Sequence, residues 1–256
     1  MTVLITGASS GIGESLAIKY AEAGEDLVLA ARSIERLHQQ KAELSQKYGV
    51  QIAVFESDLS LEGSAQKLYK QISDNGLKIH TLINNAGVGL FGEFHITELA
   101  KEEAMIQLNI TSLTALTKLF GKDMIQSGKG RILNVASVAA YFPGPLMAVY
   151  YASKAYVKSF SLALSNEWKD LGVQVSVLCP GATSTGFKDA AELDESKLFQ
   201  KKIMSAEEVA NEAFEQFHKG KEEIIPGAMN RIQTRFGSMV SSKTAAAIVR
   251  KTQERV

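Results

Sequence analysis

Three residues in the middle of the sequence carry groups that could move a proton onto a carbonyl oxygen. Tyr150 and Lys154 are four residues apart, which places both side chains on one face of a helix, and Ser137 precedes them. A tyrosine can donate a proton, but its ordinary pKa of about 10 is too high for a base at neutral pH unless a nearby ammonium group lowers it. A serine hydroxyl can hold the oxygen with a second hydrogen bond. The spacing therefore predicts acid–base chemistry at a carbon–oxygen bond, and it favours Tyr150 over Tyr151, whose partner four residues on is Ala155.

A glycine-rich segment near the amino terminus has the pattern of a phosphate-binding turn. The short apolar run Thr2–Thr6 leads through Thr6–Gly13 (TGASSGIG) into a helical pattern. In this arrangement Gly7 permits a tight turn, Gly11 lets the backbone approach a pyrophosphate, and Gly13 allows a helix to pack closely on a strand. The N–H groups at a helix N-terminus then favour phosphate. We expect a dinucleotide here, and a plain tight turn is the alternative.

The residue after the second apolar run predicts which dinucleotide binds. In NAD-binding proteins an acidic residue at this place bonds the ribose hydroxyls, whereas an arginine accommodates the additional phosphate of NADP. Here Leu27–Ala30 is followed by Ala31 and Arg32, with no carboxylate. A guanidinium group matches phosphate in charge and shape. We therefore expect NADP(H) in preference to NAD(H), and the alternative for Arg32 is a solvated charge at the start of a helix.

This chemistry requires a fold that brings the ends of several strands together. Short apolar runs alternate with helical patterns such as Ser15–Ala23, Glu35–Tyr48 and Ala65–Ser73, and Ser205–Glu208 has the form of a capping box that opens a helix through about His218. Alternation predicts parallel strands with right-handed crossovers, and almost wholly apolar runs predict burial on both faces. In such sheets ligands bind beyond the carboxyl ends of the strands. The sequence thus predicts an α/β fold, a doubly wound parallel sheet (Rossmann fold) of about seven strands with helices on both faces, with strands at Thr2–Thr6, Leu27–Ala30, Gln51–Phe55, His80–Asn84, Arg131–Ala136, Val173–Leu178 and Glu223–Pro226.

Composition and charge exclude other classes of protein. The 256 residues include 28 basic and 28 acidic side chains, and 45% are apolar, which is typical of a globular protein and speaks against nucleic-acid binding as a main role. Without a linker or repeat, we expect a single domain over residues 1–256. The amino terminus lacks a signal-peptide pattern, the uncharged stretch 132–153 is too polar for a membrane span, and the single cysteine, Cys179, fits a reducing compartment, so we expect a cytoplasmic protein. No metal site is expected, because the four histidines show no metal-ligand spacing: His38, His80, His95 and His218.

Two further motifs complete a resemblance to one enzyme family. Asn84–Gly87 (NNAG) closes the fourth apolar run, and Pro180-Gly181 follows the sixth. Together with the glycine turn, Ser137 and the Y-x-x-x-K pair, their order and spacing resemble the short-chain dehydrogenase/reductase family, in its subtype of about 250 residues. Within that family the chain looks most like NADP-dependent bacterial ketone and carbonyl reductases.

The resemblance implies a role for each residue of these motifs. Tyr150 would be the acid–base residue, Ser137 would orient the carbonyl group and Lys154 would modulate the tyrosine. Asn109 matches a helix asparagine that holds a water in the proton relay. Asp58 matches a residue that bonds the adenine amine, and a helix cap is its alternative. The residues expected to bind the cofactor are Gly7, Ser9, Ser10, Gly11, Ile12, Gly13, Arg32, Asp58, Leu59, Asn85, Ala86, Gly87, Tyr150, Lys154, Pro180, Gly181, Thr183 and Thr185.

The uncharged stretch and the segment after Thr185 are expected to shape the substrate site. Residues 141–147 would form an apolar wall, and residues about 186–204 occupy the place of the family's variable substrate lid. This favours an apolar or medium-chain carbonyl compound over a sugar or a charged acid. The side chains expected to contact it are Leu90, Phe91, Phe142, Met147 and Phe187.

The resemblance implies an NADP(H)-dependent oxidoreductase that transfers a hydride between nicotinamide and a carbonyl or secondary alcohol. A 3-oxoacyl thioester reductase is one alternative. A non-catalytic regulator that binds NADP(H) is another, and the intact set of Asn109, Ser137, Tyr150 and Lys154 speaks against it.

The carboxyl end departs from the pattern of many short family members, which end in a glycine-rich strand that packs in a tetramer. Residues 230–256 have a helical pattern instead, with six basic residues and one acidic residue from Arg231 onward. This speaks against a ketoreductase of fatty-acid synthesis and against the usual tetramer, so a homodimer is expected, with a homotetramer as the alternative. We expect the basic tail to be a solvated helix face, and contact with an anionic membrane or a partner is the alternative.

Overall fold

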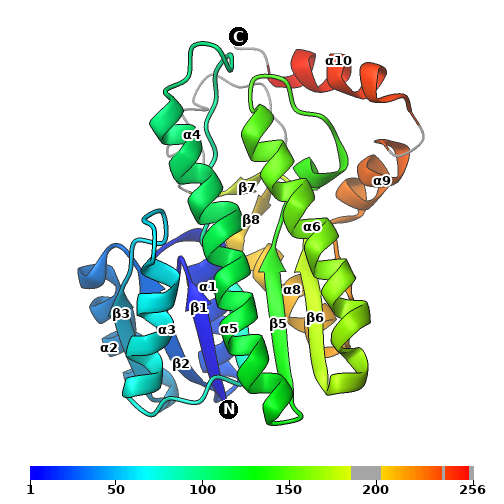
Figure 1. The fold of residues 1–256 in the computed structure, drawn as a ribbon. Helices are drawn as coiled ribbons and strands as arrows, with labels where there is room; N and C mark the ends of the chain where they lie inside the picture. Colours follow the sequence, from blue (N-terminus) through cyan, green and yellow to red (C-terminus); the bar gives the residue numbers. More distant parts are fainter. Residues whose placement is uncertain (186–202, 238–239, 254–256) are drawn as a thin grey trace.

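The computed structural model describes residues 1–185, 203–237 and 240–253. Within these ranges, seven parallel strands form one sheet in the order β3-β2-β1-β4-β5-β6-β9 (Figure 1). The order reverses between β1 and β4, which is the switch point at which such sheets bind ligands. The predicted doubly wound sheet is therefore confirmed. Its strands are β1 (Thr2–Thr6), β2 (Asp26–Ala31), β3 (Ile52–Glu56), β4 (Thr81–Asn84), β5 (Gly130–Val135), β6 (Val173–Leu178) and β9 (Glu223–Ile224), and β7 (Thr183–Ser184) pairs separately with β8 (Met204–Ser205).

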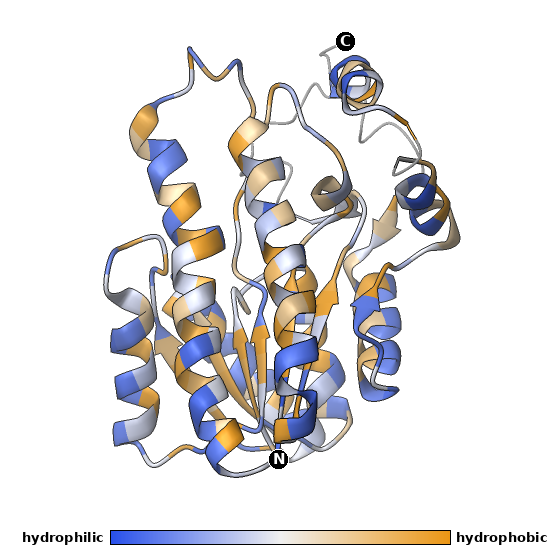
Figure 2. Ribbon diagram, turned by 45° about the vertical axis from the view of Figure 1, so that its right-hand side comes forward, coloured by the Kyte–Doolittle hydropathy of each residue, from blue (hydrophilic) through white to orange (hydrophobic). Residues whose placement is uncertain are grey.

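Helices cover both faces of the sheet, because alternate side chains of each strand enter different cores. Val3 and Ile5 of β1 belong to one core, and Leu4 belongs to the other. Figure 2 shows the apolar strands between helices that are apolar on one side and polar on the other. The first core packs against α1 (Gly11–Glu22), α2 (Ile34–Tyr48) and α8 (Ala206–His218), and the second against α3 (Ser64–Asp74), α5 (Leu113–Gln126) and α6 (Ala148–Trp168).

The start of α8 is the capping box that the sequence predicts. Ser205 Oγ accepts a hydrogen bond from the Glu208 backbone N–H at 3.1 Å, and a Glu208 carboxylate oxygen accepts one from the Ser205 N–H at 2.8 Å. The helix ends at His218, so the predicted helix is confirmed at both ends.

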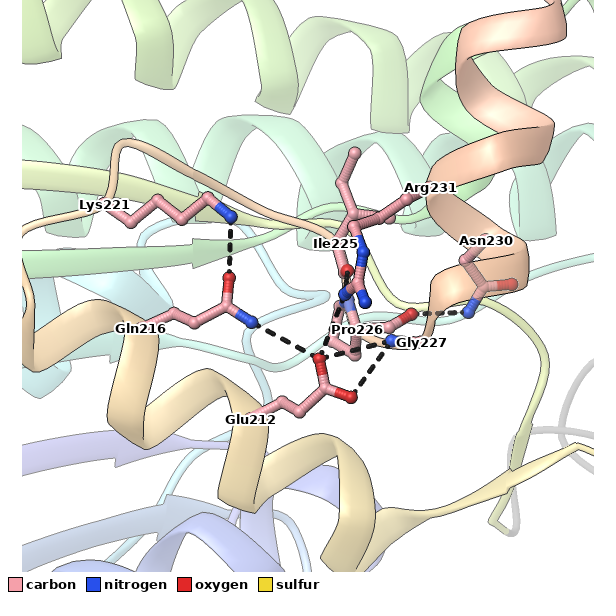
Figure 3. A network of polar contacts seen from close by, with 8 residues as sticks. All are labelled: Glu212, Gln216, Lys221, Ile225, Pro226, Gly227, Asn230 and Arg231. Carbon is pink, nitrogen blue, oxygen red and sulfur yellow. Dashed lines mark hydrogen bonds and ion pairs between the residues drawn. The ribbon is translucent and has the colours of Figure 1, made fainter.

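The carboxyl end forms two helices, α9 (Ala228–Gly237) and α10 (Ser242–Gln253), and Asn230 and Arg231 near the start of α9 make polar contacts with the rest of the protein (Figure 3). Asn230 donates a hydrogen bond to the Pro226 backbone oxygen at 2.7 Å, and Arg231 reaches both the Ile225 backbone oxygen at 3.0 Å and Glu212 of α8 at 3.3 Å. These bonds attach the start of α9 to α8 and to the segment after β9. On its outer side α9 carries the exposed polar residues Gln233 and Arg235 together with the exposed apolar residues Met229, Ile232 and Phe236.

No helix in the described part of the chain combines the length and the apolar character that crossing a bilayer requires.

Candidate active site

A cleft of about 930 Å³ opens at the carboxyl ends of the central strands, where the strand order reverses. Segments that follow β1, β2, β3, β4, β5 and β6 all contribute to its walls, so residues far apart in the sequence meet there. Most residues expected to bind cofactor or substrate line it: Gly7, Ser9, Ser10, Gly11, Ile12, Arg32, Asp58, Leu59, Asn85, Ala86, Gly87, Leu90, Ser137, Met147, Tyr150, Lys154, Pro180, Gly181, Thr183 and Thr185.

The turn after β1 is built for close approach between backbones. Gly7 has a positive φ of 63°, and a Cβ there would lie 2.9 Å from the Cα of Ala86. A Cβ at Gly13 would collide with the Gly7 backbone oxygen, so helix α1 can pack on the turn only with glycine at this position. Gly13 therefore supports the cleft from behind rather than lining it.

Asn85 ties the turn after β4 to the turn after β1. Its side-chain Nδ2 donates hydrogen bonds to the backbone oxygens of Thr6 at 3.0 Å and Gly7 at 3.1 Å. In return, Thr6 Oγ1 accepts hydrogen bonds from the backbone N–H groups of Asn85 and Ala86, each at 3.1 Å. The asparagine of the NNAG motif thus holds the glycine turn in place by its side chain.

The N-terminus of α1 faces the cleft at Gly11. Ser10 is its N-cap residue, and its side chain makes no capping hydrogen bond, so the first N–H groups of the helix are left for another partner. The positive end of the helix dipole favours a phosphate group at this position. The glycine turn and this helix start therefore fit the pyrophosphate of a dinucleotide.

Arg32 and Asp58 line the part of the cleft that lies beyond this turn. Arg32 follows β2 directly and is exposed, so its guanidinium can meet a charged group of a ligand. Asp58 Oδ1 accepts hydrogen bonds from the backbone N–H of Ser60 at 3.0 Å and from its hydroxyl at 2.6 Å. Asp58 shapes the turn after β3 and is not a helix cap, because the N-cap of α3 is Gly63.

The groups with the chemistry of proton transfer meet on one wall. Tyr150 and Lys154 lie on α6, and the lysine nitrogen is 5.8 Å from the centre of the tyrosine ring. Lys154 Nζ donates a hydrogen bond to the Val135 backbone oxygen at the end of β5, at 3.0 Å. Ser137 Oγ accepts a hydrogen bond from the backbone N–H of Ala139 at 3.1 Å and donates one to the Pro180 backbone oxygen at 3.4 Å, and the residue lines the cleft.

Burial changes the acidity of this pair. Burial raises the pKa of Tyr150 to about 12, and a hydrogen bond with Ser137 acts in the opposite direction. Burial lowers the pKa of Lys154 to about 8. At neutral pH the phenol therefore carries its proton and the lysine is charged, which suits proton donation to an oxygen that becomes negative.

Asn109 lies behind the cleft wall, in the π-helical segment Gln107–Ser112 between α4 (Leu99–Ile106) and α5. Its Oδ1 accepts a hydrogen bond from the Val88 N–H at 3.0 Å, and its Nδ2 donates to the Val88 oxygen at 2.9 Å and to Ser153 Oγ at 3.1 Å. Ser153 Oγ in turn donates to the Tyr150 backbone oxygen at 2.7 Å. The side chain of Asn109 thus connects α6 to the loop after β4. A π-helical turn is often found at functional sites.

Only some of the residues expected to contact substrate line the cleft. Leu90 and Met147 line the cleft and pack together with Tyr150, while Phe91 packs against this cluster without lining the cleft. Phe142 lines a separate hollow, together with its neighbours in the sequence and with Tyr151, Ala152 and Ala155 of α6. Residues 141–147 therefore do not form one wall of the main cleft. Phe187 and most of the expected lid lie outside the described residues.

The residues that line the cleft without having been predicted include Met105, Tyr151 and Gln253. Met105 comes from α4, and its apolar helical spacing is a signal that could have found it. Tyr151 is next to Tyr150 and also faces the cleft, whereas Gln253 comes from the last turn of α10. Nothing in the sequence indicates that Gln253 returns to the centre of the fold.

Comparison with known proteins agrees with this site. A family model described as short chain dehydrogenase matches residues 1–196. The 17-beta-hydroxysteroid dehydrogenase type 3 of Mus musculus is 33% identical over 244 residues, which cover 91% of this chain and 76% of the mouse protein. The very-long-chain 3-oxoacyl-CoA reductase of Anas platyrhynchos is 36% identical over 188 residues, 71% of this chain and 59% of that reductase. The chain thus spans less than two thirds of the length of some curated relatives that it matches.

Solved structures share the fold over nearly the whole chain. A short-chain dehydrogenase from Sphingobium yanoikuyae in complex with NADPH has a TM-score of 0.84 and 33% identity, with 93% of each chain covered. The bulky-bulky ketone specific alcohol dehydrogenase of Comamonas testosteroni has a TM-score of 0.79 and 31% identity, again with 93% of each chain covered. A Burkholderia phymatum family member in complex with NAD has a TM-score of 0.81 and 27% identity, with 91% of each chain covered. This chain therefore belongs to the short-chain dehydrogenase/reductase family of oxidoreductases.

Proposed function

We propose that this chain is an NADP(H)-dependent carbonyl reductase, or alcohol dehydrogenase in the reverse direction, for a substrate with an apolar body. The observation that carries the proposal is the buried set of Ser137, Tyr150 and Lys154 on the wall of a cleft that begins at a phosphate-binding turn. Proton donor and cofactor-binding turn share one cleft, as hydride transfer to a carbonyl requires.

The cleft residues fit a nicotinamide dinucleotide. Gly7, Gly11 and the N-terminus of α1 would hold the pyrophosphate, and Asp58 would lie on the adenine side. Arg32 supports NADP over NAD, because it is the first exposed side chain after β2 and the residues beside it are Ala31 and Ser33. Family members are known with bound NADPH and with bound NAD, so it is Arg32, and not membership of the family, that supports NADP here.

The protein side of the reaction follows from the positions of three groups. When bound, the nicotinamide supplies or accepts the hydride. As the carbonyl oxygen becomes negative, Tyr150 donates its phenolic proton to that oxygen, and the Ser137 hydroxyl donates a second hydrogen bond to it. The charged Lys154 stabilises the phenolate that Tyr150 leaves behind. For oxidation of an alcohol, the same three groups act in the reverse order.

The remaining cleft wall near Tyr150 supports an apolar substrate. Leu90, Met105 and Met147 are buried there and pack as one cluster with Tyr150 and Ala139. A sugar would leave hydroxyl groups without partners against such a wall. A ketone or aldehyde with an aliphatic or aromatic body therefore fits best.

The test is consumption of NADPH with a panel of aldehydes, ketones, diketones and 3-oxoacyl thioesters, with Tyr150→Phe as the blank. We expect consumption with apolar ketones that disappears in Tyr150→Phe. Turnover retained in Tyr150→Phe would mean that another group donates the proton to the carbonyl oxygen. A preference for short charged keto acids would overturn the proposal that the substrate is apolar.

A 3-oxoacyl thioester reductase is the second candidate. The sequence similarity to the very-long-chain 3-oxoacyl-CoA reductase of Anas platyrhynchos favours it. Activity restricted to the thioesters of the same panel would select this candidate. The expected homodimer and the expected cytoplasmic location stay predictions, which the mass in solution and cell fractionation test.

A further inference from the structure

The carboxyl-terminal helix α10 contributes its last turn to the cleft. Its inward face consists of Ala245, Val249 and Gln253, which are four residues apart and buried. On its outer side Arg250 forms an ion pair with Glu93, in the loop before α4, at 3.4 Å. The helix therefore ends with a glutamine that is completely buried, with a relative exposure of 0%, and that lines the cleft.

Gln253 has one hydrogen-bond partner and one orphaned atom. Its Nε2 donates to the hydroxyl oxygen of Tyr151 at 2.6 Å. Its Oε1 is buried and has no partner among the described residues. Buried polar atoms are rarely left unpaired in native proteins, and among the described residues with such an atom Gln253 is the one that lines the cleft, so its Oε1 is a candidate partner for a ligand group.

The pair can both donate and accept. Tyr151 receives the hydrogen bond from Gln253, so its own O–H proton can be donated elsewhere. Burial raises the pKa of Tyr151 above its ordinary value, which keeps that proton in place at neutral pH. A half turn of the Gln253 carboxamide makes Tyr151 the donor of the pair and presents the amide N–H groups instead of Oε1. The pair therefore suits either a hydroxyl group or a carbonyl oxygen.

The Tyr151–Gln253 pair lies near Tyr150, the proposed proton donor. The rings of Tyr150 and Tyr151 pack edge to face with their centres 6.0 Å apart. Both rings line the same cleft, and the wall beside them is formed by the apolar Leu90, Met105 and Met147. The Tyr151–Gln253 pair thus places polar groups beside these apolar side chains, and Lys101, four residues before Met105 on α4, is a further polar residue that lines the cleft.

We propose that Tyr151 and Gln253 form a second polar subsite, which binds an oxygen of the substrate other than the one that is reduced. The inference rests on the proposed carbonyl reductase function and narrows its substrate class. The substrate is an apolar ketone, or its alcohol, that carries a second hydroxyl or carbonyl group away from the reacting carbon.

The test uses pairs of ketones that differ only by a second oxygen. Suitable pairs are benzylacetone and its para-hydroxy analogue, cyclohexanone and its diones, and long-chain methyl ketones with and without a terminal hydroxyl. We compare kcat/KM within each pair for wild type, Gln253→Met, Tyr151→Phe and the control Gln233→Met, which changes an exposed glutamine of α9. Gln253→Met keeps the length of the side chain, and Tyr151→Phe removes only the hydroxyl group.

In wild type we expect the oxygenated member of at least one pair to be preferred. Gln253→Met and Tyr151→Phe should each reduce that preference by several-fold to about tenfold, which is the usual effect of one lost hydrogen bond. Gln233→Met should keep it. Because Tyr151→Phe lies on α6, its result stands even if Gln253→Met disturbs the folding of α10.

A second measurement tests binding at the subsite independently of the reduction step. The rise in melting temperature with each ketone, measured with NADP present, reports binding without turnover. Absence of any Tyr150-dependent turnover would contradict the proposed function, while a larger rise for oxygenated ketones that is lost in both variants would still support the subsite. The subsite proposal would be overturned if wild type showed no preference for the oxygenated ketones, either in kcat/KM or in melting temperature. The same preference in all four proteins would also overturn it.

Discussion

The ammonium group of Lys154 is buried 5.8 Å from the centre of the Tyr150 ring, and its hydrogen-bond acceptor is the backbone oxygen of Val135. The hydrogen bond to the end of β5 thus holds the lysine beside Tyr150, the proposed proton donor. Burial lowers its pKa to about 8, from an ordinary value of 10.5. The position is costly for a charged group, which indicates that it serves chemistry rather than stability.

Lys154→Met should stabilise the folded protein at neutral pH while it removes activity. The folded-state pKa lies below the ordinary one, so the unfolded chain holds this proton more tightly, and the stability of wild type rises with pH between about 8 and 10.5. Below about pH 8, burial of the charged lysine lowers the free energy of unfolding of wild type by up to about 3 kcal/mol. The Lys154→Met protein avoids this cost but lacks the hydrogen bond to the Val135 oxygen, which lowers its free energy of unfolding by about 1 kcal/mol. We expect a net gain of about 1–2 kcal/mol in urea unfolding without cofactor.

The matched control for this variant is Lys129→Met, at an exposed lysine. It should change the free energy of unfolding by less than about 0.5 kcal/mol. A Lys154→Met protein that is less stable than wild type at neutral pH would show that the ammonium group contributes to folding.

The rate of ketone reduction should fall as pH rises through about 8. Tyr150 keeps its proton up to about pH 12, so the group that titrates first is Lys154, whose positive charge is lost above about pH 8. Lys154→Arg keeps its charge at all these pH values, so the residual activity of that variant should not show the fall. Profiles of kcat/KM for the free enzyme test this, and the same fall in Lys154→Arg would assign it to another group.

Arg32→Asp should reverse the preference for NADPH over NADH. The substitution removes a partner of the additional phosphate and places a carboxylate beside it, so the ratio of kcat/KM for the two cofactors should drop by at least about tenfold. Lys41→Asp makes the same charge change at an exposed position of α2 and should leave the ratio unaltered. An unchanged ratio in Arg32→Asp would remove this residue from the cofactor assignment.

Asn85→Ala should weaken both the fold and cofactor binding. It removes two hydrogen bonds that hold the backbone oxygens of Thr6 and Gly7, and a loss of about 1–3 kcal/mol in the free energy of unfolding is expected. The dissociation constant for NADPH should rise because the glycine turn loses its support. Asn75→Ala removes a comparable bond, to the Gln71 oxygen at 2.8 Å on the exposed end of α3, and serves as the control. Equal effects of the two variants would argue against a special role of Asn85.

The sequence alone was enough for the architecture and for the residues at the strand ends. Val3 and Ile5 enter one core and Leu4 the other because of the two-residue period of a strand, and the capping box at Ser205 follows from hydrogen bonds between near neighbours. Ser137 reaches the cleft because parallel strands bring their carboxyl ends to the same edge, and Lys154 reaches it from α6, one turn after Tyr150. Each of these features depends on local periodicity, which the sequence displays directly.

Only the tertiary structure decided which loop and tail residues face the cleft. Phe142 lines another hollow, and Asn109 is bound behind the wall to Val88 and Ser153. Gln253 reaches Tyr151 across 102 residues of sequence. Such contacts depend on the packing of distant segments and on which polar groups remain to be paired, and neither is encoded in a local pattern.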